Sequence, residues 1–142
     1  MFSIFWNGMY FNVVARERVK RAFFSKNPVF GYEKSELSEK VERYFRGERV
    51  EFDCDFELDL PDFTVRVLER TKEIPYGEIT TYGRLAEELG TSPRAIGRTL
   101  GRNPVPVLIP CHRVVSRRGI GGYSEGIEIK KALLRLEGVE LP

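Results

Sequence analysis

Residues 81–101 read TYGRLAEELGTSPRAIGRTLG, a pattern that predicts two short helices separated by a tight turn. Thr81 is a favourable cap for the first helix, which Gly90 ends. Ser92-Pro93 is the arrangement preferred at a helix start and predicts a second helix over 94–100. A helix pair of this size is typical of a helix-turn-helix unit, in which the second helix lies in a nucleic-acid groove. The same pattern also fits an ordinary packing helix.

The second of these helices carries two arginines and two very small residues. Arg94 and Arg98 lie one turn apart, whereas Ala95 and Gly97 add little bulk and allow the helix backbone to approach another surface closely. Residues 94–118 contain six arginines and no acidic residue. Such a cluster suits a phosphate backbone, because the guanidinium group binds phosphate through two parallel hydrogen bonds. A solvated basic face is the alternative interpretation.

Downstream of the helix pair, residues 109–115 read IPCHRVV and place a thiol beside the only histidine of the chain. A thiolate is the nucleophilic form of cysteine, and a neighbouring base or cation lowers the thiol pKa, so Cys111 is a candidate nucleophile. A buried structural cysteine is the alternative. On a strand, Cys111 and His112 would point to opposite faces. They could then interact only through a backbone bend, which Pro110 favours, or through a water molecule.

Residues 1–58 predict a small mixed unit in which we find no chemistry. Asn7-Gly8 between two apolar runs is a strong hairpin signal. A third extended run is expected over 19–24, and a helix should follow Ser35. The alternating acidic and apolar residues of 51–58 predict an edge strand or an extended linker.

The composition indicates a globular protein with one core, or with one domain and a small companion. The chain has 142 residues, of which 42% are hydrophobic and 31% charged. It has no apolar run of the ~18 residues that span a bilayer and no signal-peptide pattern at its start, so a cytoplasmic location is expected. Two distant cysteines and one histidine do not match a zinc site, and we expect no metal or other cofactor.

Taken in order, these motifs resemble those of the O6-alkylguanine-DNA alkyltransferases, which repair DNA by accepting an alkyl group on a cysteine. The resemblance covers roughly residues 61–140. It is carried by Ile74-Pro75-Tyr76-Gly77, Thr81-Tyr82-Gly83, Arg94-Ala95-Ile96-Gly97, Asn103-Pro104, Pro110-Cys111-His112-Arg113-Val114-Val115, Gly122-Tyr123-Ser124, Lys130 and Glu137-Gly138. It implies an α+β fold, with a small ribonuclease H-like α/β domain over 1–58 and a helical, winged-helix-like DNA-binding domain over 59–142.

The resemblance also implies roles for individual residues. Cys111 would accept the alkyl group, His112 would deprotonate it through a water molecule, and Glu137 would orient His112. Tyr82 would donate a hydrogen bond to the leaving guanine. Further substrate-pocket positions would be Ser124, Tyr123, Asn103 and Lys130. Residues in contact with DNA would be Arg94, Ala95, Gly97, Arg98 and Arg113.

The partner implied by the resemblance is double-stranded DNA bearing O6-alkylguanine, bound by a monomer from the minor groove. Arg94 would fill the space left by the flipped nucleotide. One alternative is an alkyltransferase-like protein that binds lesions without transferring the alkyl group. Such proteins replace the cysteine, whereas Cys111 is present here. A purely architectural DNA-binding domain and a cysteine hydrolase are two further alternatives.

Overall fold

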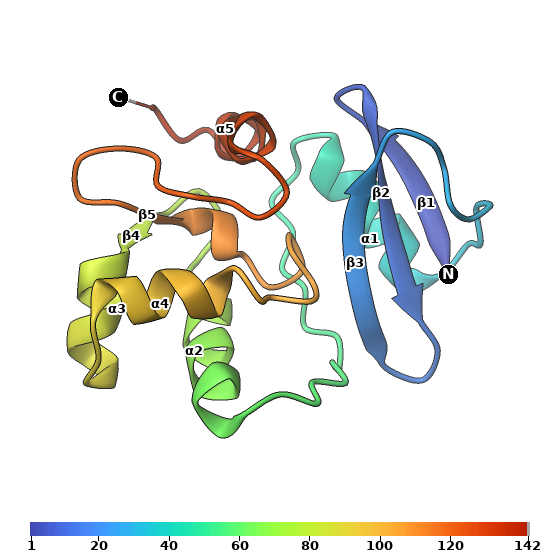
Figure 1. Ribbon diagram of the computed structural model, residues 1–142. Coiled ribbons are helices and arrows are strands. Elements are labelled where there is room, and N and C mark those ends of the chain that lie inside the picture. The colour runs from blue at the N-terminus through green and yellow to red at the C-terminus, as the bar shows by residue number, and fades with distance from the viewer. Residues whose placement is uncertain (142) are drawn as a thin grey trace.

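A three-stranded antiparallel sheet and one helix form the N-terminal part of the molecule, shown in a computed structural model that describes residues 1–141 (Figure 1). The strands, in spatial order, are β1 (Phe2–Trp6), β2 (Met9–Ala15) and β3 (Val19–Ser25). The predicted hairpin is confirmed, since Trp6 pairs with Met9 across the Asn7-Gly8 turn. Both turn residues have positive φ, at 53° and 78°, as tight hairpin turns require.

Helix α1 (Glu36–Phe45) begins at Ser35, as the sequence predicts. The Ser35 side chain accepts a hydrogen bond from Ser38 N, and the Ser38 hydroxyl accepts one from Ser35 N, which forms a capping box. The helix packs on the sheet through Phe45, whose ring stacks on Trp6 with centroids 4.8 Å apart. Its apolar side is therefore buried.

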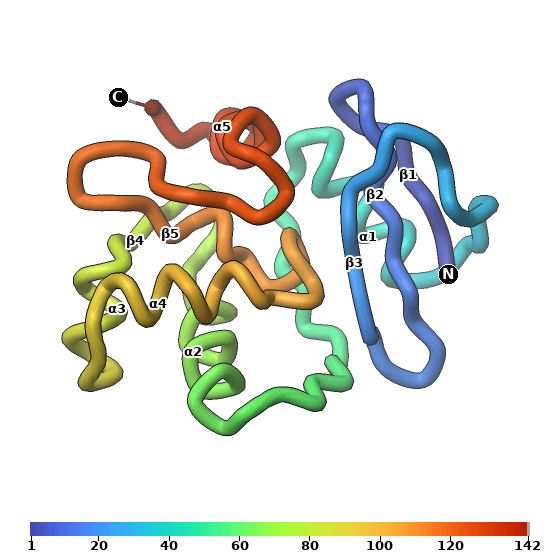
Figure 2. The backbone as a smooth tube through the Cα atoms, in the orientation of Figure 1, coloured from blue at the N-terminus to red at the C-terminus, as the bar shows by residue number. Residues whose placement is uncertain are grey.

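The segment between α1 and the next helix is an extended linker rather than an edge strand. Its only bridge to the sheet joins Phe56 to Val19, and its backbone follows the gap between the two parts of the molecule (Figure 2). The β3 strand faces the C-terminal part, because Ala22 N donates to Pro104 O at 2.9 Å. One hydrophobic cluster joins side chains from both parts of the chain.

The described C-terminal part consists of four α-helices, one turn of 3-10 helix and a two-stranded parallel sheet, arranged as in Figure 1. The predicted helix starts are confirmed, because Thr81 accepts a hydrogen bond from Arg84 N and Ser92 accepts one from Ala95 N. Gly90 ends its helix with φ 68°. The elements are α2 (Asp62–Lys72), β4 (Thr80–Thr81), α3 (Tyr82–Leu89), α4 (Pro93–Leu100), β5 (Val114–Val115) and α5 (Ile127–Leu136).

The apolar stretch around Cys111 differs from the expected strand. Residues Cys111–Arg113 form one turn of 3-10 helix, η1, and only Val114–Val115 pair as a strand. Val107, a β-branched residue, has φ 73° in the preceding loop. The bend that Pro110 suggested is therefore present, and it removes the strict strand alternation between Cys111 and His112. Within residues 1–141 no helix is both long and apolar enough to cross a membrane.

Candidate active site

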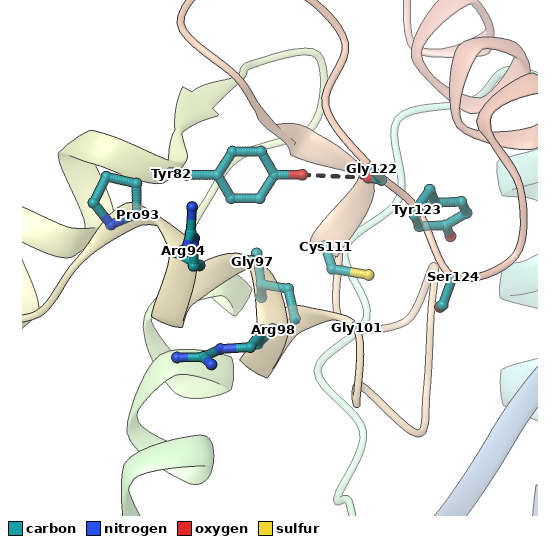
Figure 3. A pocket seen from close by; sticks show the side chains of 11 residues that line it. Tyr82, Pro93, Arg94, Gly97, Arg98, Gly101, Cys111, Gly122, Tyr123 and Ser124 are labelled. Carbon is teal, nitrogen blue, oxygen red and sulfur yellow. Dashed lines mark hydrogen bonds between the residues drawn. The ribbon is translucent and has the colours of Figure 1, made fainter.

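A cavity of about 490 Å³ opens beside Cys111 between the helix pair and the loop that precedes α5 (Figure 3). Helix α4 supplies Arg94 and Arg98 to its mouth, and both side chains are exposed. Gly97 lies between them, where the absence of a side chain keeps the cavity open towards Tyr82. The lining residues are Tyr82, Pro93, Arg94, Gly97, Arg98, Leu100, Gly101, Cys111, Gly122, Tyr123 and Ser124.

The structure thus brings seven of the thirteen predicted site residues to one cavity, and Arg113 is one of the six that do not line it. Ala95 is on α4 but does not line the cavity, and Asn103, His112, Lys130 and Glu137 lie behind it. In the part of the chain that the structure describes, no three histidine, cysteine or acidic side chains gather as a metal site.

Asn103 fixes the loop that carries Cys111. Its amide Nδ2 donates to Cys111 Sγ at 3.2 Å and to Ile109 O at 3.0 Å. Its Oδ1 accepts from Val105 N at 3.0 Å. One buried side chain therefore ties both ends of the loop together and aims the sulfur.

The Cys111 thiol is protonated at neutral pH, contrary to the activation that the sequence suggested. Burial raises its pKa to about 11, and the hydrogen bond from Asn103 and the charge of Lys130 offset this only in part. His112 Nε2 and the Arg113 guanidinium bond to Glu137 and not to the thiol. Reaction at this sulfur consequently needs a base that removes the proton.

His112 is fully buried and is suited to be that base. Its Nε2 lies 2.6 Å from Glu137 Oε2, whereas Nδ1 has no hydrogen-bond partner among the described residues. Because a carboxylate only accepts, we assign the proton to Nε2, which leaves a free lone pair on Nδ1. Burial lowers the pKa of His112, so the imidazole is neutral and able to accept a proton.

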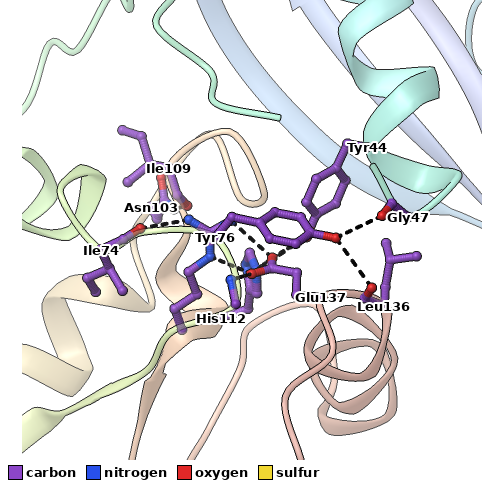
Figure 4. A network of polar contacts seen from close by, with 11 residues as sticks. Tyr44, Gly47, Ile74, Tyr76, Asn103, Ile109, His112, Leu136 and Glu137 are labelled. Atoms are coloured by element: carbon purple, nitrogen blue, oxygen red, sulfur yellow. Dashed lines mark hydrogen bonds and ion pairs between the residues drawn. The ribbon is translucent and has the colours of Figure 1, made fainter. Parts of the chain in front are cut away.

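The Glu137 carboxylate is the centre of a buried polar network (Figure 4). Oε1 accepts from Arg113 Nε at 2.7 Å and from Gly77 N at 2.9 Å. Oε2 accepts from His112 Nε2, from Arg113 Nη2 at 3.1 Å and from the Tyr44 hydroxyl at 2.5 Å. Burial alone would raise the pKa of Glu137, but His112 and Arg113 hold it well below its usual range. The carboxylate is therefore ionised at neutral pH.

The expected role of Arg113 in DNA binding is wrong. Its side chain is buried, it forms a two-pronged ion pair with Glu137, and its Nη1 donates to Ile74 O at 2.7 Å. Each of its three nitrogens thus donates to a group inside the fold, and the guanidinium is not displayed on the DNA-facing surface. Arg113 serves instead to hold the Glu137 charge in place.

Tyr44 is a site residue that sequence reasoning missed. It comes from α1 in the N-terminal part, where no chemistry was expected, and its hydroxyl reaches Glu137 and lies 3.4 Å from His112 Nε2. In the sequence it is one of several apolar positions on one side of a helix. Nothing in that pattern separates it from an ordinary core residue.

Lys130 holds the cavity wall from behind. Its ammonium donates to Val114 O at 2.7 Å, to Gly122 O at 2.9 Å and to the Tyr82 hydroxyl oxygen at 3.3 Å. Burial without an acidic partner lowers its pKa to about 8. Tyr82 in turn donates to Gly122 O at 3.2 Å (Figure 3), and burial raises the pKa of its phenol, which stays protonated.

Fold and site together define a protein with a buried cysteine thiol beside a cavity and a helix-turn-helix unit. The family model described as 6-O-methylguanine DNA methyltransferase, DNA binding domain, matches residues 62–139. The chain belongs to this family.

Individual relatives extend the match to almost the whole chain. A methylated-DNA–protein-cysteine methyltransferase of Archaeoglobus fulgidus is 48% identical over 146 aligned positions, which cover 98% of this chain and 99% of the relative. The crystal structure of O6-methylguanine-DNA methyltransferase from Pyrococcus kodakaraensis superposes with a TM-score of 0.80 at 31% identity, covering 97% and 98% of the two chains. Mycobacterium tuberculosis OGT in complex with DNA gives 0.80 at 30% identity, covering 95% and 90%.

Proposed function

We propose that this protein repairs DNA by transferring an alkyl group, methyl in the simplest case, from the O6 atom of guanine to its own Cys111. The observation that carries this proposal is the position of the Cys111 sulfur. It lies between an open cavity with arginines at its mouth and a buried His112–Glu137 pair. The 48% identity to a methylated-DNA–protein-cysteine methyltransferase supports the same reaction.

In this reaction the thiol proton passes to Nδ1 of His112 through a water molecule, and Glu137 stabilises the resulting imidazolium. The free lone pair on Nδ1 supports this role. The sulfur then attacks the alkyl carbon, a sulfur–carbon bond forms and the carbon–O6 bond breaks. The electron pair of that bond leaves with guanine.

The leaving guanine would carry a negative charge unless donors neutralise it. Tyr82 is the proton donor and Ser124 contacts the guanine oxygen, while Tyr123 forms the adjoining wall. All three line the cavity. The product is a thioether, which water does not hydrolyse as it would an acyl-enzyme, so each chain reacts once.

DNA binds with α4 in the minor groove and the damaged nucleotide flipped into the cavity. Flipping costs a few kcal/mol, and Arg94 offsets part of this by filling the vacated stack. The small Ala95 and Gly97 let the helix backbone come close, and Arg98 contacts a phosphate.

The finer description of the fold is part of the proposal. Residues 1–58 form a ribonuclease H-like domain, which the sheet with α1 supports. Residues 59–142, of which residue 142 lies outside the described part, form a winged-helix-like domain in which the loop after β5 is the wing. The protein acts as a cytoplasmic monomer.

The direct test follows alkyl groups from DNA to protein. Incubation with duplex DNA that contains O6-methylguanine should add one methyl group per chain, at Cys111, as measured by intact mass and peptide mapping. Cys111→Ala should bind the same DNA and gain nothing, because the substitution removes only the acceptor. A wild-type chain that binds the lesion without a mass gain would instead be a lesion-binding protein, and repeated turnover would indicate a hydrolase.

A further inference from the structure

Helix α1 carries one polar group into the buried network behind Cys111. Tyr44 is completely buried, and its hydroxyl donates to Glu137 Oε2 at 2.5 Å (Figure 4). The same hydroxyl oxygen lies 3.4 Å from His112 Nε2. The N-terminal part of the chain thus reaches the proposed base and its orienting carboxylate through a single side chain.

The contact matters because Tyr44 and His112 donate to the same oxygen of Glu137. A carboxylate oxygen that accepts a second strong hydrogen bond has less negative charge to offer the first donor. Burial raises the pKa of the Tyr44 phenol well above its usual value, so the hydroxyl keeps its proton and remains a donor throughout the neutral range.

We propose that Tyr44 is a positioning residue for alkyl transfer, which holds Oε2 of Glu137 and limits how strongly that oxygen attracts the His112 imidazole. The inference rests on the proposed function, in which His112 is the base. It makes the N-terminal part of the chain a component of the active site rather than a cover for it.

The distances from the Tyr44 hydroxyl to Glu137 and to His112 determine whether Tyr44 raises or lowers the basicity of the imidazole. The hydroxyl also offers an oxygen to His112, but at 3.4 Å this contact is much weaker than the bond to Glu137 at 2.5 Å. Removing the hydroxyl therefore leaves Oε2 a stronger acceptor and makes the imidazole more basic. The other titratable or charged groups around His112 and Glu137 are Arg113, Lys130, Tyr76, Tyr123 and Cys111.

Tyr76 offers a matched control. Its ring lies against that of Tyr44, with centroids 6.0 Å apart. Its hydroxyl donates to the backbone oxygens of Gly47 and Leu136 and not to the carboxylate. Tyr76→Phe thus removes a neighbouring hydroxyl without changing the number of donors on Glu137.

The test uses the fact that His112 is the only histidine of the chain, so its imidazole signals in NMR need no assignment. In DNA-free Tyr44→Phe at neutral pH, the proton on Nε2 should move downfield, because its bond to Glu137 becomes stronger. In single-turnover transfer, the acid limb of the rate profile should shift upward by about half to one pH unit. The plateau rate should change less than about threefold.

Tyr76→Phe should leave both the imidazole signal and the acid limb unchanged. Equal spectra for wild type and Tyr44→Phe, or equal shifts in both variants, would overturn the inference. If Tyr44→Phe does not fold, 3-fluorotyrosine at position 44 keeps the hydroxyl and makes it a stronger donor, so both readouts should move in the opposite direction. An unmoved signal in that protein would also overturn the inference.

The experiment distinguishes failure of the role proposed for Tyr44 from failure of the proposed alkyl transfer. The imidazole spectrum needs neither DNA nor transfer, so it tests the link from Tyr44 to His112 even if no alkyl group ever reaches Cys111. Conversely, normal transfer together with an unchanged spectrum would reject the role of Tyr44 and keep the proposed function.

Discussion

The two sides of Cys111 differ in how far their polar groups are buried and hydrogen-bonded within the protein. Behind it, the Glu137 carboxylate receives five hydrogen bonds, four from the buried side chains of Tyr44, His112 and Arg113 and one from the backbone of Gly77. In front of it, the cavity is lined by a few polar groups and by exposed arginines of α4. The hydrogen bonds behind Cys111 form when the chain folds, whereas the exposed arginines in front of it gain partners only when a substrate binds.

This difference separates stability from recognition. A buried polar network loses much when one member is removed, because the groups that were bonded to it are then left unpaired in a medium of low dielectric. An exposed side chain at the front loses only its contacts with the ligand. Substitutions behind the sulfur should therefore change both folding and transfer, and those in front should change transfer alone.

Glu137→Gln should have the largest effect, since it leaves the buried Arg113 without a counter-charge and the His112 imidazolium without stabilisation. We expect a loss of about 3 kcal/mol in the free energy of unfolding. We also expect at least ~100-fold slower transfer, as when the orienting acid of a catalytic triad is neutralised. Urea unfolding and single-turnover kinetics measure the two losses.

The pH dependence of stability gives this prediction a second readout. The pKa of Glu137 is lower in the folded chain than its ordinary value, so its contribution is fully present above the unfolded-state pKa and is lost progressively as pH falls from there through the folded-state pKa. The wild type should lose stability on acidification more steeply than Glu137→Gln. Glu140→Gln, at an exposed position three residues away, should behave as the wild type. If the free energy of unfolding falls equally steeply with acidification in the wild type and in Glu137→Gln, the assignment of a buried charge to Glu137 is wrong.

Arg94→Ala should weaken recognition of duplex DNA and leave the hydrogen-bond network around Glu137 unchanged. Transfer from duplex DNA should fall by ~10- to 100-fold, because the cost of flipping is no longer offset. Reaction with the free O6-alkylguanine base should stay unchanged, as it requires no flipping. Arg102→Ala, at an exposed position just beyond α4, is the control: it removes the same charge from the arginine cluster and should lower transfer from duplex DNA far less than Arg94→Ala does. Equal losses on duplex and free base would refute the role of Arg94.

The same contrast explains what the sequence could predict. The starts of α3 and α4 and the Asn7-Gly8 hairpin depend on local backbone chemistry, in which a cap or a positive φ is supplied by the residue itself. The cavity and its main lining residues were accessible through the family resemblance. These features are either local or located by a distinctive motif.

Of the network around Glu137, only the His112–Glu137 pair was expected, through the family resemblance. The other contacts could not be predicted, because their members are far apart in the chain. Arg113 looks like one of six similar arginines until the end of α5 brings Glu137 against it. Tyr44 reaches the same carboxylate across 93 positions of sequence. The turn at Cys111 depends on the Asn103 amide, which bonds to a sulfur eight positions away. Such contacts are set by tertiary packing, to which residue type and spacing give no guide.

Gly121→Ala tests the loop that forms the cavity wall beside Tyr82. Its expected effect on alkyl transfer is the smallest of those predicted. Gly121 has φ 77°, and a Cβ atom there would lie 2.7 Å from Cε2 of the Tyr82 ring. Alanine should therefore strain the backbone and displace the phenol that donates to the leaving guanine. We expect a loss of about 1 kcal/mol in the free energy of unfolding and a transfer rate lower by a few-fold to ~10-fold.

Gly119→Ala, in the same loop, is the matched control, because a Cβ atom there makes only an ordinary contact with Ser116 Oγ at 3.7 Å, the backbone is outside the left-handed region and Gly119 does not line the cavity. It should leave stability and transfer close to those of the wild type. The wall of the cavity would then depend on one close contact rather than on general loop flexibility. If both alanine variants slow transfer equally, the loop acts through its mobility, and Tyr82 does not need the fixed position that Gly121 allows.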